Sequence, residues 1–307
     1  GDTHFDFLAL SAAETDPDTR AGLLQSFNRL QAKYPDNSQL QFGKALLLQQ
    51  NGQPQEALEL LEQQPSKDRP IASILLHARL LQSLERNDEA LPLLEKGIEQ
   101  YPDDKRLRLT YARLLVAEDR LDEAKGEFAS LLQQNPDDDD LRFSLALVCL
   151  EAKAWKEAIV YLEELVERGS HSEAAHYNLA RAYEELGDTA SALIEYALVG
   201  PGNDYLPAQA RQSELLFKAQ RAEEAAERLR QARESQPDYA IQLYLIEAEA
   251  WSKQQDTERA WQLIQQGLEQ FPEDLNLLYT RAMLAEKRDD LALLERDLRF
   301  ILEREPD

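Results

Sequence analysis

Residues 102–137 read PDDKRLRLTYARLLVAEDRLDEAKGEFASLLQQNPD, a stretch that opens and closes on the same dipeptide, proline followed by aspartate. Leu, Ala, Glu, Gln and Arg dominate it, and these residues lose little rotamer freedom in a helix. Two small residues, Ala112 and Ala124, lie twelve positions apart between the prolines. The stretch therefore predicts two helices between proline-acid stops, with little else in between.

The proline-acid step returns at a nearly constant interval. It occurs at Pro35, Pro102, Pro136, Pro237, Pro272 and Pro306, each followed by Asp or Glu. Neighbouring steps are 34 or 35 residues apart, and the two wider gaps are close to two and three such intervals. The period is 34 residues, and nine periods fill the 307-residue chain.

Small residues fall at two fixed places in each period. The first set is Ala45, Ala78, Ala112, Ala146, Ala180, Ser213, Ala248 and Ala282. The second set is Ala57, Ala90, Ala124, Ala158, Ala192, Ala225 and Ala260, and a bulky side chain follows each of these four residues later. A methyl group at both places lets two antiparallel helices approach closely. We expect the proline to end the second helix, the acid after it to cap the next helix, and each hairpin to need a neighbour that covers its apolar face.

This period and phasing resemble the tetratricopeptide repeat (TPR) family over the whole chain, since HEAT and armadillo units run to about 40–47 residues. The resemblance implies an all-α fold, a right-handed TPR superhelix (α-solenoid) of about nine helix-turn-helix repeats in a single array over residues 1–307. The expected repeats are 4–37, 38–71, 72–104, 105–138, 139–172, 173–205, 206–240, 241–274 and 275–307. Leu23 and Leu294 replace the small residue in the first and last repeats. The segment Gly200-Pro201-Gly202-Asn203-Asp204 stands in for a proline-acid step, so we expect it to shorten a second helix, as a kink or as a plain length variation.

The charge and the composition limit the partners. The formal net charge is −24, which argues against nucleic acid and against an anionic lipid surface. The sequence contains no run of 18 apolar residues, so it predicts no direct membrane insertion. Cys149 is the single cysteine, so no internal disulfide can form. The chain opens at Gly1 without a signal peptide and stops at Pro306-Asp307, so we expect it to be a fragment of a longer protein.

Catalytic and metal-binding patterns are missing from the sequence. Of the histidines His4, His77, His171 and His176, the last two are five residues apart, which is not the spacing that places two imidazoles on one helix face. The acids Asp137–Asp140 lack the alternating spacing of a calcium loop, and we interpret them as helix-capping residues. Cys149 is expected to be a small hydrophobe. The sequence therefore predicts no enzyme, no metal and no cofactor.

In TPR proteins the first helix of each hairpin lines a groove, and the resemblance implies the same here. The residue after each first-helix alanine should face that groove, as should the residue three before it. Our candidate protein-binding groove consists of Arg79, Arg113, Arg181, Phe143 and Tyr177, which would hold an extended or helical protein segment bearing a carboxylate. The alternative is that the arginines pair with acids on neighbouring helices and that the aromatic side chains only pack.

Some TPR proteins bind the tails of chaperones through a clamp of Lys and Asn residues. Here other residues occupy those positions, apart from Asn178, and this departure puts a chaperone-binding role in doubt. The chain most resembles the LbcA-type bacterial outer-membrane TPR lipoproteins. That resemblance implies a periplasmic, outer-membrane-anchored adaptor that binds a carboxyl-terminal processing protease and presents substrates such as cell-wall hydrolases to it. Two alternatives remain open: a TPR structural component of an envelope assembly or secretion complex, and the regulatory part of an enzyme whose catalytic domain lies elsewhere.

Overall fold

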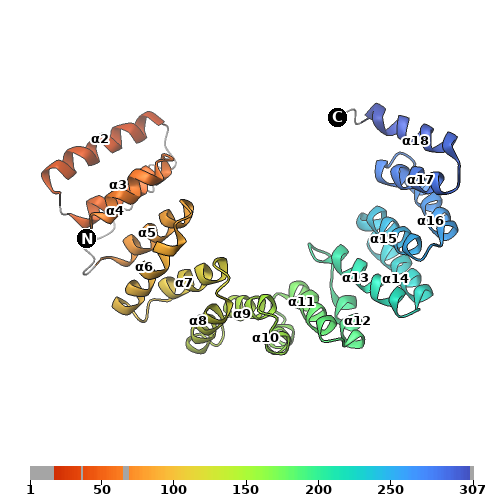
Figure 1. Ribbon diagram of the computed structural model, residues 1–307, viewed down its shortest axis with the longest axis horizontal. Coiled ribbons are helices and arrows are strands. Elements are labelled where there is room, and N and C mark those ends of the chain that lie inside the picture. Colours follow the sequence, from red (N-terminus) through yellow and green to blue (C-terminus); the bar gives the residue numbers. More distant parts are fainter. Residues whose placement is uncertain (1–16, 36, 65–68, 305–307) are drawn as a thin grey trace. The chain divides into compact units, whose positions relative to one another are not determined.

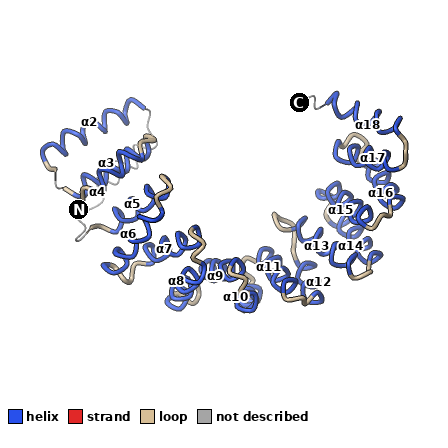
Figure 2. Tube along the Cα trace, viewed as in Figure 1, coloured by secondary structure: helices blue, strands red, loops and turns tan. Residues whose placement is uncertain are grey.

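The computed structural model describes residues 17–35, 37–64 and 69–304. These residues form seventeen α-helices and one short 3₁₀ turn, η1 (Pro237–Tyr239), and no strand (Figures 1 and 2). The first helices of the hairpins are α3 (Ser38–Gln50), α5 (Ile71–Ser83), α7 (Lys105–Ala117), α9 (Asp139–Glu151), α11 (Ser172–Glu185), α13 (Tyr205–Lys218), α15 (Ala240–Lys253) and α17 (Leu275–Lys287). The second helices are α2 (Pro17–Lys33), α4 (Pro54–Glu62), α6 (Asn87–Gln100), α8 (Leu121–Gln134), α10 (Trp155–Glu167), α12 (Thr189–Leu198), α14 (Ala222–Ser235), α16 (Thr257–Gln270) and α18 (Leu291–Arg304). The expected all-α fold of TPR-type hairpins is confirmed.

The chain divides into two compact units, residues 1–152 and 153–307. Within each unit every described helix packs on the next one in the chain. Consecutive first helices also touch each other, as α5 does α7 in the first unit and α13 does α15 in the second. Of the first expected repeat, 4–37, the residues before Pro17 lie outside the described residues.

The alanine seam is buried as the sequence predicts. Every alanine of the two sets is at most 1 % exposed, and Ser213, which replaces one of them, is 3 % exposed. The bulky residues one turn after the second set are also buried, from Leu61 and Leu94 to Tyr196 and Ile264. Two helices can approach this closely only where each presents a methyl group, so the seam determines how each hairpin closes.

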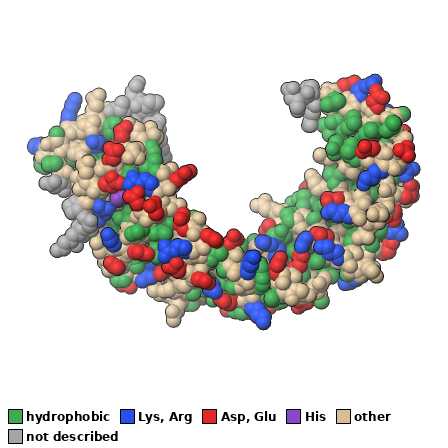
Figure 3. All heavy atoms as spheres, viewed as in Figure 1, with side chains coloured by type: hydrophobic (Ala, Val, Ile, Leu, Met, Phe, Trp, Pro, Cys, Tyr) green, Lys and Arg blue, Asp and Glu red, His purple; other side chains and the backbone are tan. Residues whose placement is uncertain are grey.

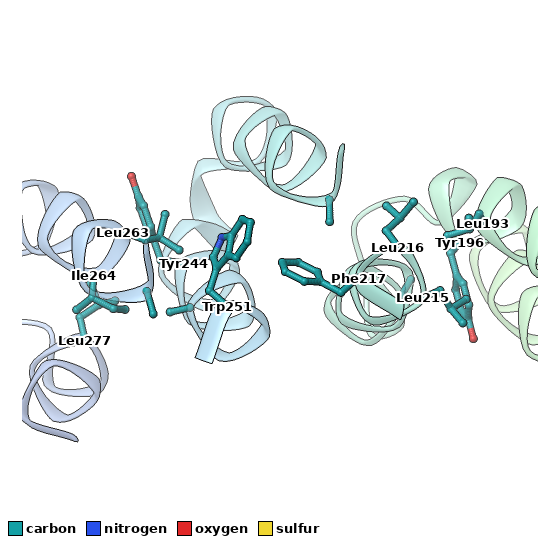
Figure 4. Close-up of a cluster of buried hydrophobic side chains, with 14 of the residues drawn as sticks. Leu193, Tyr196, Leu215, Leu216, Phe217, Tyr244, Trp251, Leu263, Ile264 and Leu277 are labelled. Atoms are coloured by element: carbon teal, nitrogen blue, oxygen red, sulfur yellow. The ribbon is translucent and has the colours of Figure 1, made fainter. Parts of the chain in front are cut away.

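One core cluster of the second unit extends across helices α11 to α17, and Figure 4 shows part of it. Its aromatic side chains interlock between hairpins: the rings of Phe217 and Trp251 meet edge to face, with centroids 4.8 Å apart and an interplanar angle of 82°. Tyr196 is fully buried, and Tyr244 and Ile264 fill the space between the next helices. Each hairpin is therefore held by its neighbours.

Where an acid caps a first helix, it is not the one that directly follows the proline, so this expectation was wrong by one residue. The first helices α5, α11, α13 and α15 have no side-chain cap. At Pro102-Asp103-Asp104 the cap is Asp104, whose Oδ1 accepts the Leu107 N–H at 3.1 Å. The Asp104 N–H donates to the Tyr101 carbonyl at 3.1 Å, so Pro102 and Asp103 are the central residues of a turn. Caps at the same place are Asn37, Asp138 and Asp274.

Helix α12 has 10 residues and ends at Leu198, before the Gly200–Asp204 segment, which confirms the expected shortening. None of the described helices is both long and apolar enough to cross a membrane.

Candidate protein-binding site

The five candidate groove residues lie on first helices, but in both units. Arg79 is on α5, Arg113 on α7 and Phe143 on α9, all in the first unit. Tyr177 and Arg181 are one turn apart on α11, in the second unit. The structure therefore brings Tyr177 and Arg181 together. In the first unit Arg79 and Arg113 occupy equivalent places on successive first helices, directly after the alanine, and Phe143 stands three residues before the alanine of its helix.

The three arginines are exposed, and none forms an ion pair with a carboxylate among the residues that the structure describes. Most other arginines do, for instance Arg86 with Glu89 at 2.6 Å and Arg108 with Glu127 at 3.0 Å. The interpretation that acids on neighbouring helices neutralise the three guanidinium groups is therefore wrong for the described part of the chain.

Contacts on α11 hold Arg181 in place without neutralising it. Its guanidinium lies over the Tyr177 ring, 6.0 Å from the centroid, and its Nη1 donates to Asn178 Oδ1 at 3.2 Å. Asn178 is itself buried and donates through Nδ2 to the Ala174 carbonyl at 2.8 Å. The Tyr177 ring packs against Tyr196 with centroids 5.9 Å apart. Arg181 is thus oriented by a cation–π contact and a hydrogen bond while its positive charge stays exposed.

A cavity of about 340 Å³ opens between the first helices α11, α13 and α15 of the second unit. Apolar side chains, among them Tyr177, Phe217 and Ile246, form part of its wall. Lys218 and Lys253 line it too, paired with Glu214 at 2.9 Å and Glu249 at 2.8 Å. The cavity combines an apolar floor with a charged rim, and Tyr177 links it to Arg181.

Sequence reasoning missed several residues of this cavity. Phe217, Ile246, Lys218 and Lys253 were outside both positions that we expected to face the groove. Lys218 and Lys253 share one phase, five residues after the small residue of their helices, so this repetition was a usable signal. Phe217 carried no such signal, because the equivalent positions of the other first helices hold unrelated residues.

Elsewhere the structure describes polar groups that contribute to packing. Burial, together with the neighbouring Arg69 guanidinium, lowers the pKa of His77 to about 4, and His77 Nδ1 lies 2.9 Å from Arg69 Nη1. Cys149 is fully buried, which confirms its expected place in the core, and His4 lies outside the described residues. Within residues 17–35, 37–64 and 69–304 no group of three or more His, Cys, Asp or Glu side chains is placed to hold a metal ion.

Figure 3 shows basic and acidic side chains interspersed with hydrophobic ones over the face that it draws, without one continuous basic area on that face.

Comparisons with known proteins agree with this geometry. Two family profiles, both described as tetratricopeptide repeat, match residues 81–148 and 149–203 and residues 211–274, more than half of the chain together. A TPR repeat-containing protein of Pseudomonas aeruginosa is 70% identical over all 307 residues, and the chain spans 52% of that relative's length. The solved structure of a tetratricopeptide repeat protein from Parabacteroides merdae matches with a TM-score of 0.51 at 14% identity, over 89% of this chain and 99% of that one.

Proposed function

Because this chain belongs to the tetratricopeptide repeat family, whose members are typically non-catalytic protein-interaction scaffolds, we propose that it is itself a non-catalytic scaffold that binds a partner polypeptide along its first helices. The bound segment is extended or helical and carries carboxylates toward the arginines. In the second unit, the cavity beside Tyr177 takes an apolar side chain of that segment.

One observation carries this proposal: Arg79, Arg113 and Arg181 are exposed without an ion-pair partner in the described chain, at one phase of three first helices. A guanidinium that is left free can form a two-pronged hydrogen-bonded pair with a carboxylate, which contributes more than a neutral hydrogen bond. In the first unit Arg79 and Arg113 repeat on successive first helices, and such a repeat fits a chain-like ligand better than a small molecule.

For the full-length protein we propose the adaptor role that the LbcA-type resemblance implies. Anchored at the outer membrane, it would hold a periplasmic carboxyl-terminal processing protease and present cell-wall hydrolases to it. By binding both proteins on one array, the adaptor would raise the local concentration of the substrate around the protease, and it would need no catalytic group of its own. What supports this is the sequence resemblance and the family's role in protein binding.

A charge-reversal experiment tests the scaffold proposal. The variant Arg79→Glu/Arg113→Glu/Arg181→Glu should recover the partners of the affinity-tagged wild type at about tenfold lower yield or less, because three charge-assisted contacts become repulsive. The control Lys96→Glu/Lys156→Glu/Arg299→Glu changes the net charge equally, on exposed positions of second helices, and should retain them. Unchanged recovery by the first variant would exclude the arginine surface as the binding site.

Mass spectrometry of the proteins recovered from cells tests the adaptor role separately. We expect a carboxyl-terminal processing protease among them, together with a hydrolase that is degraded more slowly when the triple variant replaces the wild type. If the arginines prove necessary for binding but no protease is recovered, the scaffold stands and the adaptor role does not.

A further inference from the structure

The residue directly before the small residue of each first helix differs from hairpin to hairpin. Two of the eight first helices carry leucine there, Leu145 in α9 and Leu179 in α11, and both leucines are buried. The other six first helices carry a polar side chain, and no two of the six are alike: Lys44, His77, Tyr111, Gln212, Glu247 and Arg281. The small residue that follows is alanine in every hairpin but one. A variable polar position therefore lies beside a nearly constant seam.

Each of these polar side chains has a partner of its own, in four cases on the second helix that precedes it in the chain. Tyr111 Oη donates to Glu95 Oε1 of α6 at 2.7 Å. Gln212 Nε2 donates to the Leu193 carbonyl of α12 at 2.9 Å. The remaining pairs are Lys44 with Gln31 at 2.6 Å, His77 with Arg69 at 2.9 Å, Glu247 with Arg233 at 2.6 Å and Arg281 with Asp297 at 2.6 Å.

The pair between α14 and α15, Arg233 and Glu247, is almost enclosed by protein. The two side chains are 10% and 6% exposed, and Arg233 Nη1 donates to Glu247 Oε2. Glu247 Oε1 also accepts from Trp251 Nε1 at 3.3 Å. The Arg233 guanidinium lies over the Tyr244 ring, 4.4 Å from its centroid. A charge buried this far without its partner is strongly unfavourable, so α15 packs well only on a helix that supplies a cation at this place.

Two interfaces of the same chain are apolar at the corresponding place. Arg233 stands eight residues after Ala225 in α14. The same phase holds Leu132 in α8 and Val166 in α10, which precede the two first helices that carry leucine, α9 and α11. Hydrophobic burial is non-directional, so helices with the same alanine seam and similar apolar side chains can pair in more than one combination. The polar interfaces lack this freedom.

We propose that the side chain before the small residue determines on which hairpin each first helix packs. A wrong pairing buries its polar group beside one that cannot bond to it. If α15 replaced α7 on α6, for instance, Glu247 would take the place of Tyr111 beside Glu95, and two carboxylates would meet. Wrong assembly is a characteristic failure of repeat proteins, and a single buried polar side chain is known to fix register in coiled coils. This role is independent of the proposed binding of a partner.

Refolding of a variant with an apolar pair between α14 and α15 tests this inference. Arg233→Leu/Glu247→Leu copies the leucines at the same phases of α8 and α9, and its unfolding midpoint in urea should equal or exceed that of the wild type. After refolding at high protein concentration it should form at least about tenfold more dimer or larger species of native helix content, because α15 now also fits α8 and α10 of a second copy. Size-exclusion chromatography with light scattering and circular dichroism measure both properties.

Two single substitutions and a matched control separate the choice of neighbour from stability. Glu247→Leu alone leaves Arg233 buried without a carboxylate and should raise the unfolding equilibrium constant about 100-fold or more. Gln212→Leu needs no second change, since its partner is a main-chain carbonyl, and it should raise the dimer fraction without burying a charge. The control Leu132→Met/Leu145→Met alters an interface that is already apolar and should refold as the wild type does.

Three outcomes would overturn the inference. The first is refolding of Arg233→Leu/Glu247→Leu with no more dimer than the wild type. The second is a loss of stability in this variant as large as in Glu247→Leu, because the pair would then stabilise the fold without selecting a neighbour. The third is an equal rise of dimer in Leu132→Met/Leu145→Met, because any change at an interface would then have the same effect.

Discussion

At the residue scale, the alanines of the seam occupy space that no larger side chain fits. Ala112 of α7 and Ala146 of α9 are both fully buried where two helices meet. Helix α7 packs on α6 and α8, and α9 packs on α8. A change at these positions therefore tests the close approach directly.

Replacing Ala112 with Leu should lower the free energy of unfolding by about 1–3 kcal/mol, because the added atoms force the helices apart or push side chains off their rotamers. Urea denaturation followed by circular dichroism measures the change. Ala117→Leu, at the exposed end of the same helix, is the control and should shift the midpoint little. Equal effects of the two substitutions would mean that the alanine seam is not what holds the hairpin closed.

The buried His77 makes the stability of the chain depend on pH. Its folded-state pKa of about 4 lies below the ordinary value near 6.5, because burial and the Arg69 and Arg86 guanidinium groups disfavour the imidazolium. The unfolded chain therefore takes up the proton first, so the contribution of neutral His77 is complete above about pH 6.5 and falls as the pH drops toward 4.

Between pH 6.5 and 5 this loss should reach about 1–2 kcal/mol of unfolding free energy. In His77→Gln the amide oxygen can still accept from Arg69, but nothing titrates at this position. We expect the stability of His77→Gln to vary less with pH over that window, measured by denaturant midpoints at several pH values. Parallel pH profiles of the two proteins would contradict the assignment.

At the scale of the element, the turn between the two helices of a hairpin follows one design throughout. The second residue after the first helix has positive φ, as in Gly52 and Gly187, but also in Gln220 (φ 59°) and Gln255 (φ 64°). The next residue's N–H returns to the helix, as from Arg221 to the Leu216 carbonyl at 2.9 Å. This pairing is the Schellman motif, in which glycine is the least strained residue.

Gln220→Gly should therefore stabilise the chain by about 0.5–1 kcal/mol, since a left-handed conformation strains a side chain more than the added flexibility of glycine costs in the unfolded state. The reverse change Gly187→Ala should destabilise by a similar amount. Thermal unfolding of the two variants measures both effects. If the turn were unstrained, Gln220→Gly would lower the stability and Gly187→Ala would raise it.

The residue that follows this turn begins the second helix in two different ways. Asp188 and Asp256 accept the N–H three residues later, at 3.1 and 3.0 Å. Arg86 and Arg120 instead pair with a glutamate three residues on, at 2.6 and 2.7 Å. Only the aspartates cap the helix, because a guanidinium donates and cannot accept the first N–H groups, and α6 and α8 have no side-chain cap. The position tolerates opposite charges, since a second helix begins after it in both cases.

At the scale of the whole molecule, substantial contacts run only between helices close to one another in the described chain. Stability in such an array is a sum of terms from each repeat and from its neighbours, so damage should remain local. This differs from a globular domain, in which one core change lowers the protection of every helix.

Ile264→Ala, at a fully buried position of α16, should cost about 2–5 kcal/mol. Hydrogen exchange followed by mass spectrometry should show faster exchange in α15 to α18 and unchanged exchange in α3 to α8. Uniformly faster exchange over both units would indicate that the chain unfolds as one cooperative body.

The sequence by itself determined the helices, their pairing and the seam, because a close contact between helices requires a small residue and that requirement repeats every 34 positions. The turns were predicted one residue out of place, since Asp103 and Asp104 are equivalent in composition and only the backbone path selects the cap. Only the tertiary structure decided which arginines lack a partner, that Lys253 and Tyr177 line one cavity, and that Ile194 faces solvent. The physical reason is that the 34-residue period reflects the contacts that every repeat makes, within itself and with the repeats beside it. Charge pairing and exposure differ from repeat to repeat, because they depend on individual side chains that come together from different helices.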